Sequence, residues 1–304
     1  MLNKGGNLIA GKQFTDLTKA SALKDTNIIA VHDGNGLKKA SMEDVTMYMA
    51  DKFSNPNLLI NPDFKINQRG KTSYSTGGDI LYTVDRWLLL NGIITVSDNG
   101  LTVHANNGGW IAQKLEKVIE GISTLSIKVT EINGKISLTD PSNKLFITSP
   151  GVYSITLSDV SQFNMYLYDN TSVTIEWAKL ERGSIATPFV APNLAEELMK
   201  CKRFFYKSPK TLIAYGISDM IYIKSTEVMN MRTEGTIVVV NDNSDNYIRY
   251  EGNTEKVVLD VKNFAISTKD GYIRIILKNN NLTNSKVVAL DLNSVITIDA
   301  EIYS

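Results

Sequence analysis

The sequence predicts a mainly β protein: two consecutive antiparallel β-sandwich or jelly-roll domains joined by a short helix, after a small N-terminal hairpin-plus-helix module. Short runs of alternating apolar and polar residues fill most of the chain beyond residue 55, and a period of two is typical of strands with one buried face. Turn signals such as Asn-Gly separate these runs. A proline-marked break with a helix signal interrupts them between residues 171 and 208.

Composition narrows the function classes. The 304 residues suit two domains plus smaller pieces. Lys+Arg and Asp+Glu both number 32, which argues against a nucleic-acid binder that works through a general basic field. No run approaches the roughly 20 apolar residues that span a bilayer, and the first residues lack the apolar region of a signal peptide. We therefore expect no nucleic-acid partner and no membrane insertion.

Cysteine and histidine are too scarce for the commonest metal and redox sites. Cys201 is the single cysteine, so no disulfide can form within the chain, and we expect a buried thiol. His32 and His104 lie far apart in sequence, which makes a histidine-rich metal site improbable.

Residues 1–55 are predicted to form a small attachment module. An apolar run at 28–31 followed by DGNG at 33–36 indicates a hairpin. Ser41 with Asp44 resembles a capping box at the start of a helix. This module is too small to build much core, so we expect it to dock on a neighbour or on its own symmetry mates.

Residues 56–192 are predicted to form the first β domain. The SDNG sequence at 97–100 is a hairpin signal between two alternating runs. Residues 110–121 fit both a short helix and a strand, and both interpretations stay open from the sequence. Many short strands at regular spacing favour a β-sandwich or jelly roll.

The break at 171–208 is predicted to hold the last strand of one domain, a short helix and the first strand of the next. Asn193 can cap this helix. Leu194 and Leu198 would share one helix face, and they are our candidate contacts for a trimer. Residues 193–304 then repeat the pattern of short strands and are predicted to form a second β-sandwich.

Three blocks of sequence resemble tail-tip proteins of tailed bacteriophages and related tail-like particles. NLLINPDFKINQRG with YTVDRW, at 57–70 and 82–87, resembles the opening of a carbohydrate-binding-module-like jelly roll in phage fibres. AKLERGSIATPFVAP, at 178–192, is similar to the closing strand of that domain. ELMKCKRFFYKS with MNMRTEGTIVVVN resembles the opening of the domain that often follows, and TNIIAVHDGNGLKK resembles a fibre attachment segment.

The resemblance implies a homotrimeric receptor-binding protein of the virion tail tip or baseplate, made in the host cytoplasm. Its N-terminal module would bind a phage tail or baseplate protein. Its β domains would bind a host cell-surface polysaccharide or teichoic acid and so mediate adsorption. Two alternatives remain: a glycan-binding module of a cellular adhesin or enzyme, and a tail-associated polysaccharide depolymerase.

No catalytic motif is found, so the sequence predicts a protein that is not an enzyme. There is no P-loop, no GxSxG and no HExxH. A glycosidase needs two carboxylates a few ångströms apart, which sequence alone does not reveal. The acidic residues that could supply such a pair are Asp79, Asp85, Glu116, Glu120 and Glu176.

Sugar binding needs aromatic rings that stack on the apolar face of a sugar, with amides bonding its hydroxyls. Trp110 follows a polar glycine-rich loop that holds Asn106 and Asn107, and Tyr74 lies in a second such loop. In the last domain, Tyr247 and Tyr250 lie beside a polar loop. Each ring could equally belong to a core or its rim.

The remaining predictions concern structure. Trp87 and Trp177 are expected in the core because both lie in strand-like runs, and Arg86 is expected to pair with Asp85. No cofactor is predicted, although a jelly roll of the kind the sequence resembles can hold a structural Ca²⁺. The candidate ligands for that ion are Asn57, Asn61 and Asp63.

Overall fold

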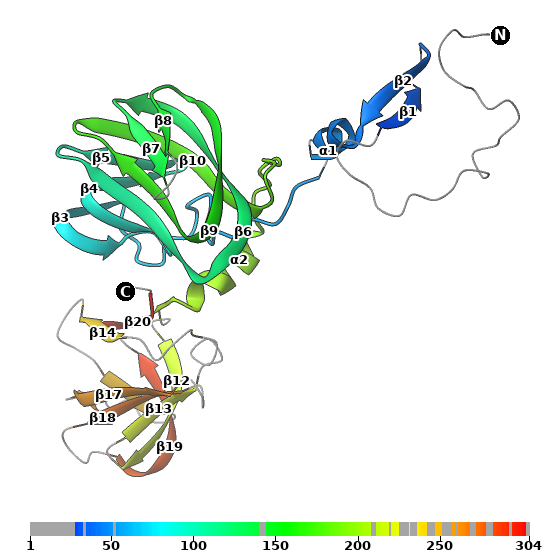
Figure 1. Cartoon of the computed structure of the whole chain (residues 1–304). Coiled ribbons are helices and arrows are strands. Elements are labelled where there is room, and N and C mark those ends of the chain that lie inside the picture. The colour runs from blue at the N-terminus through cyan, green and yellow to red at the C-terminus, as the bar shows by residue number, and fades with distance from the viewer. Residues whose placement is uncertain are drawn as a thin grey trace, which may run out of the picture. The chain divides into compact units, whose positions relative to one another are not determined.

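The computed structural model describes residues 28–32, 35–50, 53–139, 144–207, 211–218, 220–224, 231, 236–241, 247–250, 257–258, 261–267, 272–277, 282–291 and 294–301. Strands dominate these residues, so the predicted mainly β class is confirmed (Figure 1). The chain divides into two compact units, residues 1–54 and 55–304. The boundary predicted at residue 192 lies inside the second unit, and the division into two sandwich or jelly-roll domains stays a prediction.

The first unit contains a hairpin and a short helix. Strands β1 (Ile28–His32) and β2 (Leu37–Ser41) pair antiparallel, and helix α1 (Met42–Ala50) follows at once. The expected capping box is present, because Ser41 Oγ accepts from the Asp44 N–H and the Asp44 carboxylate accepts from the Ser41 N–H. The Ser41 N–H bond lowers the pKa of Asp44.

The helix of this unit, and Phe53 after it, leave large apolar side chains in solvent. Met47, Tyr48 and Phe53 are each about three-fifths exposed, at 59%, 65% and 62%. Apolar side chains stabilise a fold only when something covers them. This exposure agrees with the expectation that the module is too small for a core of its own.

The second unit is built on a large antiparallel sheet. Among the described residues its strand order is β3-β4-β5-β10-β6-β9-β7-β8. One part of β4 pairs with β5 and another with β6, so the sheet closes back on itself around its core. The strands are β3 (Ser73–Tyr82), β4 (Leu88–Ser97), β5 (Gly100–Ala105), β6 (Gly109–Asn133), β7 (Ile136–Thr139), β8 (Lys144–Ile147), β9 (Gly151–Leu167) and β10 (Thr171–Arg182).

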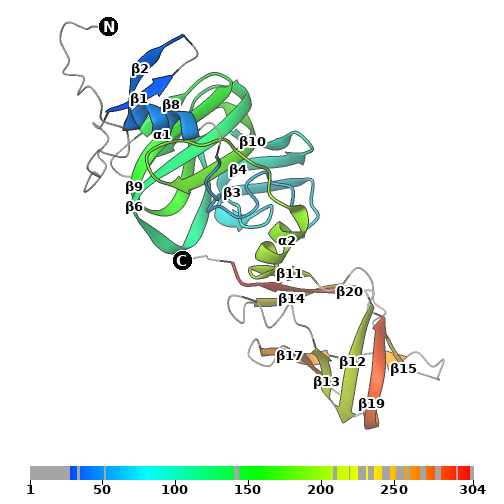
Figure 2. The same cartoon turned by 90° about the vertical axis from the view of Figure 1, so that its right-hand side faces the viewer.

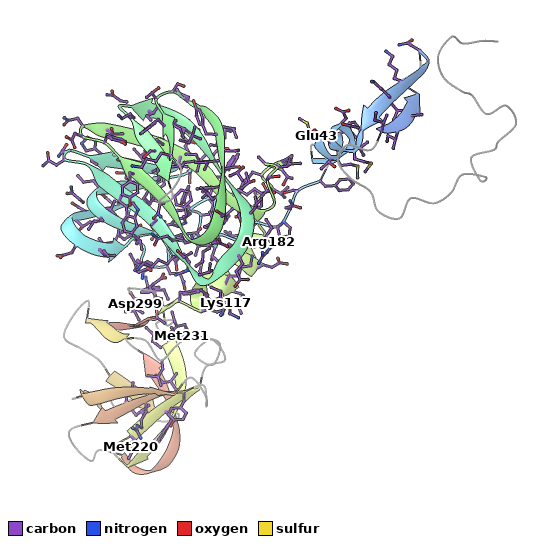
Figure 3. The ribbon with its side chains drawn as sticks, viewed as in Figure 1. Glu43, Lys117, Arg182, Met220, Met231 and Asp299 are labelled. Atoms are coloured by element: carbon purple, nitrogen blue, oxygen red, sulfur yellow. The ribbon has the colours of Figure 1, made fainter. Side chains whose placement is uncertain are left out.

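Strands β6 and β9 are long and bend together. Their pairing is irregular between residues 114 and 122 of β6, and Lys117, labelled in Figure 3, lies in this bend. Gly121 and Asp159 have left-handed backbone there, with φ of 79° and 54°, and Asp159 Oδ1 accepts from the Gly121 N–H at 2.9 Å. The stretch 110–121, which fitted either helix or strand in sequence, is therefore strand.

The hairpin predicted at 97–100 is present between β4 and β5, with Ser97 opposite Gly100. Gly100 has φ 120°, and a Cβ there would lie 2.1 Å from the carbonyl oxygen of Ile175. Only glycine suits this close approach of two strands.

The core lies inside the closed sheet and is centred on Trp87. Its ring centre lies 4.9 Å from that of Phe64 and 5.1 Å from that of Phe163, which meets it edge to face. Leu101, Ile127 and other alternating strand residues fill the space around these rings with no exposed area. Trp87 is 1% exposed, as expected.

Helix α2 (Leu194–Lys202) follows the large sheet. The predicted cap is present, because Asn193 Oδ1 accepts from the Ala195 and Glu196 N–H groups. Cys201 is fully buried, as expected, and burial raises the pKa of its thiol. Leu194 is 60% exposed. Among described helices, none is long and apolar enough to cross a membrane.

Two smaller sheets follow in the last part of the chain. Among the described residues, one has the order β11-β20-β14 and the other β16-β15-β19-β12-β13-β18-β17, and Figure 2 shows β12 beside β19. The strands are β11 (Phe205–Lys207), β12 (Thr211–Ser218), β13 (Met220–Lys224), β14 (Thr236–Asn241), β15 (Tyr247–Tyr250), β16 (Val257–Val258), β17 (Val261–Ser267), β18 (Tyr272–Leu277), β19 (Leu282–Asp291) and β20 (Ser294–Asp299).

Candidate ligand-binding surface

A row of side chains crosses the outer face of the large sheet. Strand pairing places Leu90 opposite Trp110, Trp110 opposite Tyr166, Tyr166 opposite Ser137, and Ser137 opposite Phe146. Their sequence neighbours on these strands point into the core, as Ile111 and Met165 show by their complete burial. The row therefore presents three aromatic rings, from β6, β9 and β8, on one surface.

The rings of the row are held in two pairs. Trp110 and Tyr166 have ring centres 6.2 Å apart, and Phe146 lies 6.1 Å from Tyr168, which follows β9. The outer rings stay open to solvent, with Tyr166 44% and Phe146 52% exposed. Exposed rings on a sheet face offer apolar platforms for a ligand.

The polar atoms of this face are placed by the same strands. Trp110 Nε1 donates to Asn164 Oδ1 at 2.9 Å, which fixes the indole against β9. Trp110 also packs on a small buried cluster of Tyr82, Leu88 and Ala112. A ring held from one side by a hydrogen bond and an apolar cluster is preorganised for contact on its other side.

A lysine stands over the far pair of rings. Lys135, just before β7, has its Nζ 3.9 Å from the ring centre of Tyr168 and 5.3 Å from that of Phe146. Both distances lie within the range of cation–π attraction. The β7–β8 end of the row is therefore aromatic and cationic together.

A depression of about 590 Å³ lies along β9 beside this row. A volume of this size suits a small ligand or part of a larger one. Serine, amide and charged side chains line it together with two of the rings. The lining residues are Ser137, Lys144, Leu157, Ser158, Asp159, Val160, Ser161, Gln162, Asn164, Tyr166, Leu167 and Tyr168.

The predicted loop residues lie at the near end of the row. Asn106 and Asn107 are exposed in the turn between β5 and β6, directly before Trp110. His104 Nε2 and Asn106 Oδ1 are 2.8 Å apart, and Asn91 Nδ2 donates to the carbonyl oxygen of Asn107. The amide side chains thus border the surface that carries the predicted tryptophan.

Tyr74 does not belong to this surface, which corrects the prediction that its ring serves a sugar. The residue is 4% exposed within the main core, and its hydroxyl donates to Asn67 Oδ1. Burial raises the pKa of the Tyr74 hydroxyl. Its ring turns inward because β3 alternates, so the polar loop around it gave a misleading signal.

The two tyrosines predicted in the last domain lie on β15. Their backbones pair with β19, Tyr247 opposite Asp291 and Tyr250 opposite Val288. The side chains of both lie outside the part of the chain that is described, so their role in binding stays a prediction.

The candidate calcium ligands Asn57 and Asn61 are committed to the protein itself. Asn57 Oδ1 accepts from the Leu59 and Leu180 N–H groups, and buried Asn61 bonds Ile66 through both amide atoms. Asp63 is half-buried, and burial raises its pKa. Within the described ranges, no group of three or more His, Cys, Asp or Glu side chains is placed to hold a metal ion.

A second depression, of about 600 Å³, lies beside Trp177. The prediction that Trp177 belongs to the core is corrected, because the residue is half-buried and stacks on Phe189 with ring centres 4.7 Å apart. Phe189 comes from the return loop after β10, a contact that no local pattern signals. Asp63, Asp98, Glu131 and Glu176 also line this depression, together with Lys65.

The sequence block at 57–70 and 82–87 forms a buried joint. Asn61 has left-handed backbone with φ 54°, and its amide donates to the carbonyl oxygens of Ile66 and Asp85. Trp87 Nε1 donates to the carbonyl oxygen of Asn61 at 2.8 Å. These bonds satisfy polar atoms that water does not reach, so the block has a structural role.

The expected pair between Arg86 and Asp85 is not formed. Asp85 accepts from the backbone N–H and side-chain Nε2 of Gln68, and burial raises the pKa of Asp85. Arg86, with φ 73°, donates instead to buried Glu301, beyond β20. Asp85 and Arg86 lie in a turn, and the left-handed backbone of Arg86 directs the two side chains to different partners.

Side chains of three further elements, β20, β11 and α2, contact the same joint. Arg69 pairs with Asp299 of β20, labelled in Figure 3, at 3.0 Å, and its guanidinium lies 4.0 Å from the ring centre of Phe205 in β11. The Asn61 N–H donates to Glu197 of α2 at 2.6 Å. Burial raises the pKa of Glu301, while Arg86 and Arg69 oppose that rise.

The closing block, residues 178–192, fixes the loop after β10 through a buried polar cluster. Lys179 Nζ donates to the hydroxyl and carbonyl oxygens of Thr187 and lies 3.3 Å from Glu181. Glu181 accepts from the Thr187 N–H and hydroxyl. Lys179 and Glu181 are buried, and burial lowers the pKa of Lys179.

Three of the five carboxylates considered for hydrolysis have separate partners. Glu116 pairs with Arg203, Glu176 with Lys128, and Asp85 with Gln68. Asp79 and Glu120 are exposed.

Sequence reasoning missed Tyr166, Tyr168, Phe146 and Lys135. A usable signal was the alternation in residues 163–168, where buried Phe163, Met165 and Leu167 leave two tyrosines on the opposite face. No protein-family model matches this sequence, and a search of curated proteins finds no match either.

Proposed function

We propose that this protein binds a host cell-surface glycan on the aromatic row of its large sheet. The observation that carries the proposal is the line of Trp110, Tyr166 and Phe146 across β6, β9 and β8, with Asn164 and a depression beside it. Sugars present an apolar C–H face and a rim of hydroxyls, which suits rings bordered by amides. The same face lies next to the loop that holds Asn106 and Asn107.

We further propose that the protein is the receptor-binding protein of a phage tail, and that binding mediates adsorption without cleaving the glycan. The three resembling blocks support this proposal, and two of them form the buried joint and the fixed loop described above. In this proposal the large sheet is a jelly-roll-like sandwich, and residues 1–55 attach a homotrimer to the tail or baseplate. Exposed Met47, Tyr48 and Phe53 suit such a contact.

Replacing the central ring tests the site. We expect Tyr166→Ala to weaken binding to host cells or to their isolated surface polysaccharide by about tenfold or more, because a central ring loses its stacking area. Trp110→Ala should act in the same direction. Binding is measured by biolayer interferometry of the full chain on the immobilised polysaccharide.

Val152→Ala is the matched control. Val152 lies on the same strand β9 and is 60% exposed, but it lies outside the row. Its truncation should leave binding unchanged. Trp177→Ala tests the second depression. If Trp177→Ala loses binding and Tyr166→Ala does not, the proposed site is wrong.

A further inference from the structure

Two lysines lie on the β7–β8 side of the binding face. Lys135 directly precedes β7, and Lys144 is the first residue of β8, opposite Thr139; Lys144 also lines the depression. Asp159 lines the same depression from the bend of β9. A ligand that lies along the row therefore meets these two cations at its β7–β8 end.

The cations are available to a ligand. In the ranges that the structure covers, neither lysine forms an ion pair with a described carboxylate, whereas Lys128, Lys179 and Lys200 each do. The Asp159 carboxylate already accepts a hydrogen bond from the Gly121 N–H. The lysines that have no described ion-pair partner on this face therefore lie at the β7–β8 end.

One of these cations is also held in place. The ammonium of Lys135 lies over Tyr168 at 3.9 Å and near Phe146 at 5.3 Å. Such contacts contribute about 0.5–1 kcal/mol at exposed sites, enough to favour one position of a long side chain. Because the Lys135 ammonium is already held above the rings, it can contact a substituent on a stacked sugar without losing further side-chain entropy.

Accordingly, and resting on the proposed glycan binding, we propose that this face selects glycans that carry an acidic group, a carboxylate or a phosphodiester, over neutral ones. The acidic group lies at the β7–β8 end, near Lys135 and Lys144, and sugar rings extend over Tyr166 toward Trp110. The row crosses three strand spacings, about 14 Å, so it accommodates more than one sugar unit.

The test compares an acidic polysaccharide with its matched neutral form and adds a phosphodiester polymer. The full chain is measured by biolayer interferometry on a bacterial uronic-acid polysaccharide, on its carboxyl-reduced neutral form, and on poly(glycerol phosphate). Wild type should bind an acidic polymer at least about tenfold more tightly than the neutral form. The uronate and phosphodiester arms distinguish the two sources of negative charge.

Two variants assign the selectivity to residues. The double variant Lys135→Gln/Lys144→Gln should lose the preference for the acidic polymer and keep its binding to the neutral one. Lys71→Gln removes one exposed lysine ahead of β3, at the opposite edge of the sheet, and should keep the preference. Raising the ionic strength from about 0.01 M to about 1 M should weaken only the acidic interaction.

The possible outcomes distinguish the charge selectivity from the glycan binding on which it rests. Equal binding of acidic and neutral forms, lost in Trp110→Ala, would overturn the charge selectivity and leave glycan binding standing. An unchanged preference in the double lysine variant would also overturn it. Binding of none of the three polymers, nor of polysaccharide isolated from host cells, would overturn both proposals.

Discussion

Glu301 carries a carboxylate into a site that solvent does not reach. It accepts from Arg86, which is equally buried, and lies 3.8 Å from Arg69. Two buried charges are costly to desolvate, and their attraction offsets that cost only while both are present. The pair joins the end of the described chain to the turn before β4, so a single residue connects distant parts of the second unit.

Removing the carboxylate alone should destabilise the second unit. We expect Glu301→Ala to lower the free energy of unfolding by about 3–5 kcal/mol near neutral pH, because Arg86 is left buried without its partner. Urea denaturation followed by tryptophan fluorescence measures the change. Glu196→Ala, at an exposed glutamate of α2, is the control and should change stability far less.

The same residue predicts a dependence on pH. Because burial raises the pKa of Glu301 above its ordinary value, the folded protein binds a proton there more readily than the unfolded chain does. The stability contributed by this carboxyl therefore falls as pH rises from its unfolded-state pKa through its folded-state pKa.

In Glu301→Gln this contribution is absent. The difference in unfolding free energy, wild type minus variant, should decrease as pH rises above about 4.5, the ordinary value for this group. Urea denaturation at a series of pH values gives this difference. A difference that grows with pH would instead mean that the two arginines hold the folded-state pKa below its ordinary value.

At the scale of elements, β10 is held to the loop that follows it by a buried polar cluster. Thr187 contributes a hydroxyl that accepts from Lys179 and from the Asn55 N–H and donates to Glu181. The loop then returns Phe189 onto Trp177. A hydroxyl with three partners in a mostly buried cluster is hard to replace. The charged groups of Lys179 and Glu181 both depend on it for a hydrogen bond that water would otherwise supply.

Replacing that hydroxyl tests this polar cluster. We expect Thr187→Val, which keeps the shape and removes the hydroxyl, to lower the free energy of unfolding by about 1–3 kcal/mol, since buried polar partners lose a hydrogen bond. Chemical denaturation measures the change. Ser184→Ala, in the exposed part of the same loop, should leave the free energy of unfolding nearly unchanged. Comparable losses of stability in both variants would contradict the role of the Thr187 hydroxyl.

Elements whose signals are local could be predicted from the sequence, and the proposed binding face could not. Asn193 caps α2, and Gly100 closes the β4–β5 hairpin, within a few residues of each signal. The row instead depends on register: Trp110 meets Tyr166 only because β6 and β9 pair along their length. Long-range pairing of this kind leaves no trace in a window of ten residues, so Trp110 was identified and its partner rings were not.

At the scale of the whole molecule, several apolar side chains of the described chain face solvent in the single protomer. Val190 is 65% exposed, Leu194 60% and Met199 51%, all in or just before α2. Leu198 is half-buried. Exposed apolar residues grouped on one element are typical of a surface that another protein covers, and our proposal of a homotrimer gives Leu194 and Leu198 that role.

A charge on this helix tests the proposed trimer contact. Leu194→Asp should convert a trimer to monomers, because a carboxylate cannot be buried there without a partner, and should leave the fold intact since Leu194 is exposed. Sedimentation velocity measures the mass. Ala195→Asp adds the same charge to an exposed neighbour and should keep the trimer. A wild-type monomer would exclude the trimer, and a Leu194→Asp trimer would remove α2 from its contact.

In the proposed tail-tip protein, which would have to hold a moving cell, the length of β6 and β9 has a mechanical consequence. The row sits at one end of a pairing that runs from Gly109 opposite Leu167 to Val129 opposite Gly151. A pull along these strands loads many backbone hydrogen bonds in parallel, so no single bond bears the tension. In the proposed tail tip, the sheet would resist shear. Under force, the glycan would dissociate from the aromatic rings before the strands separate.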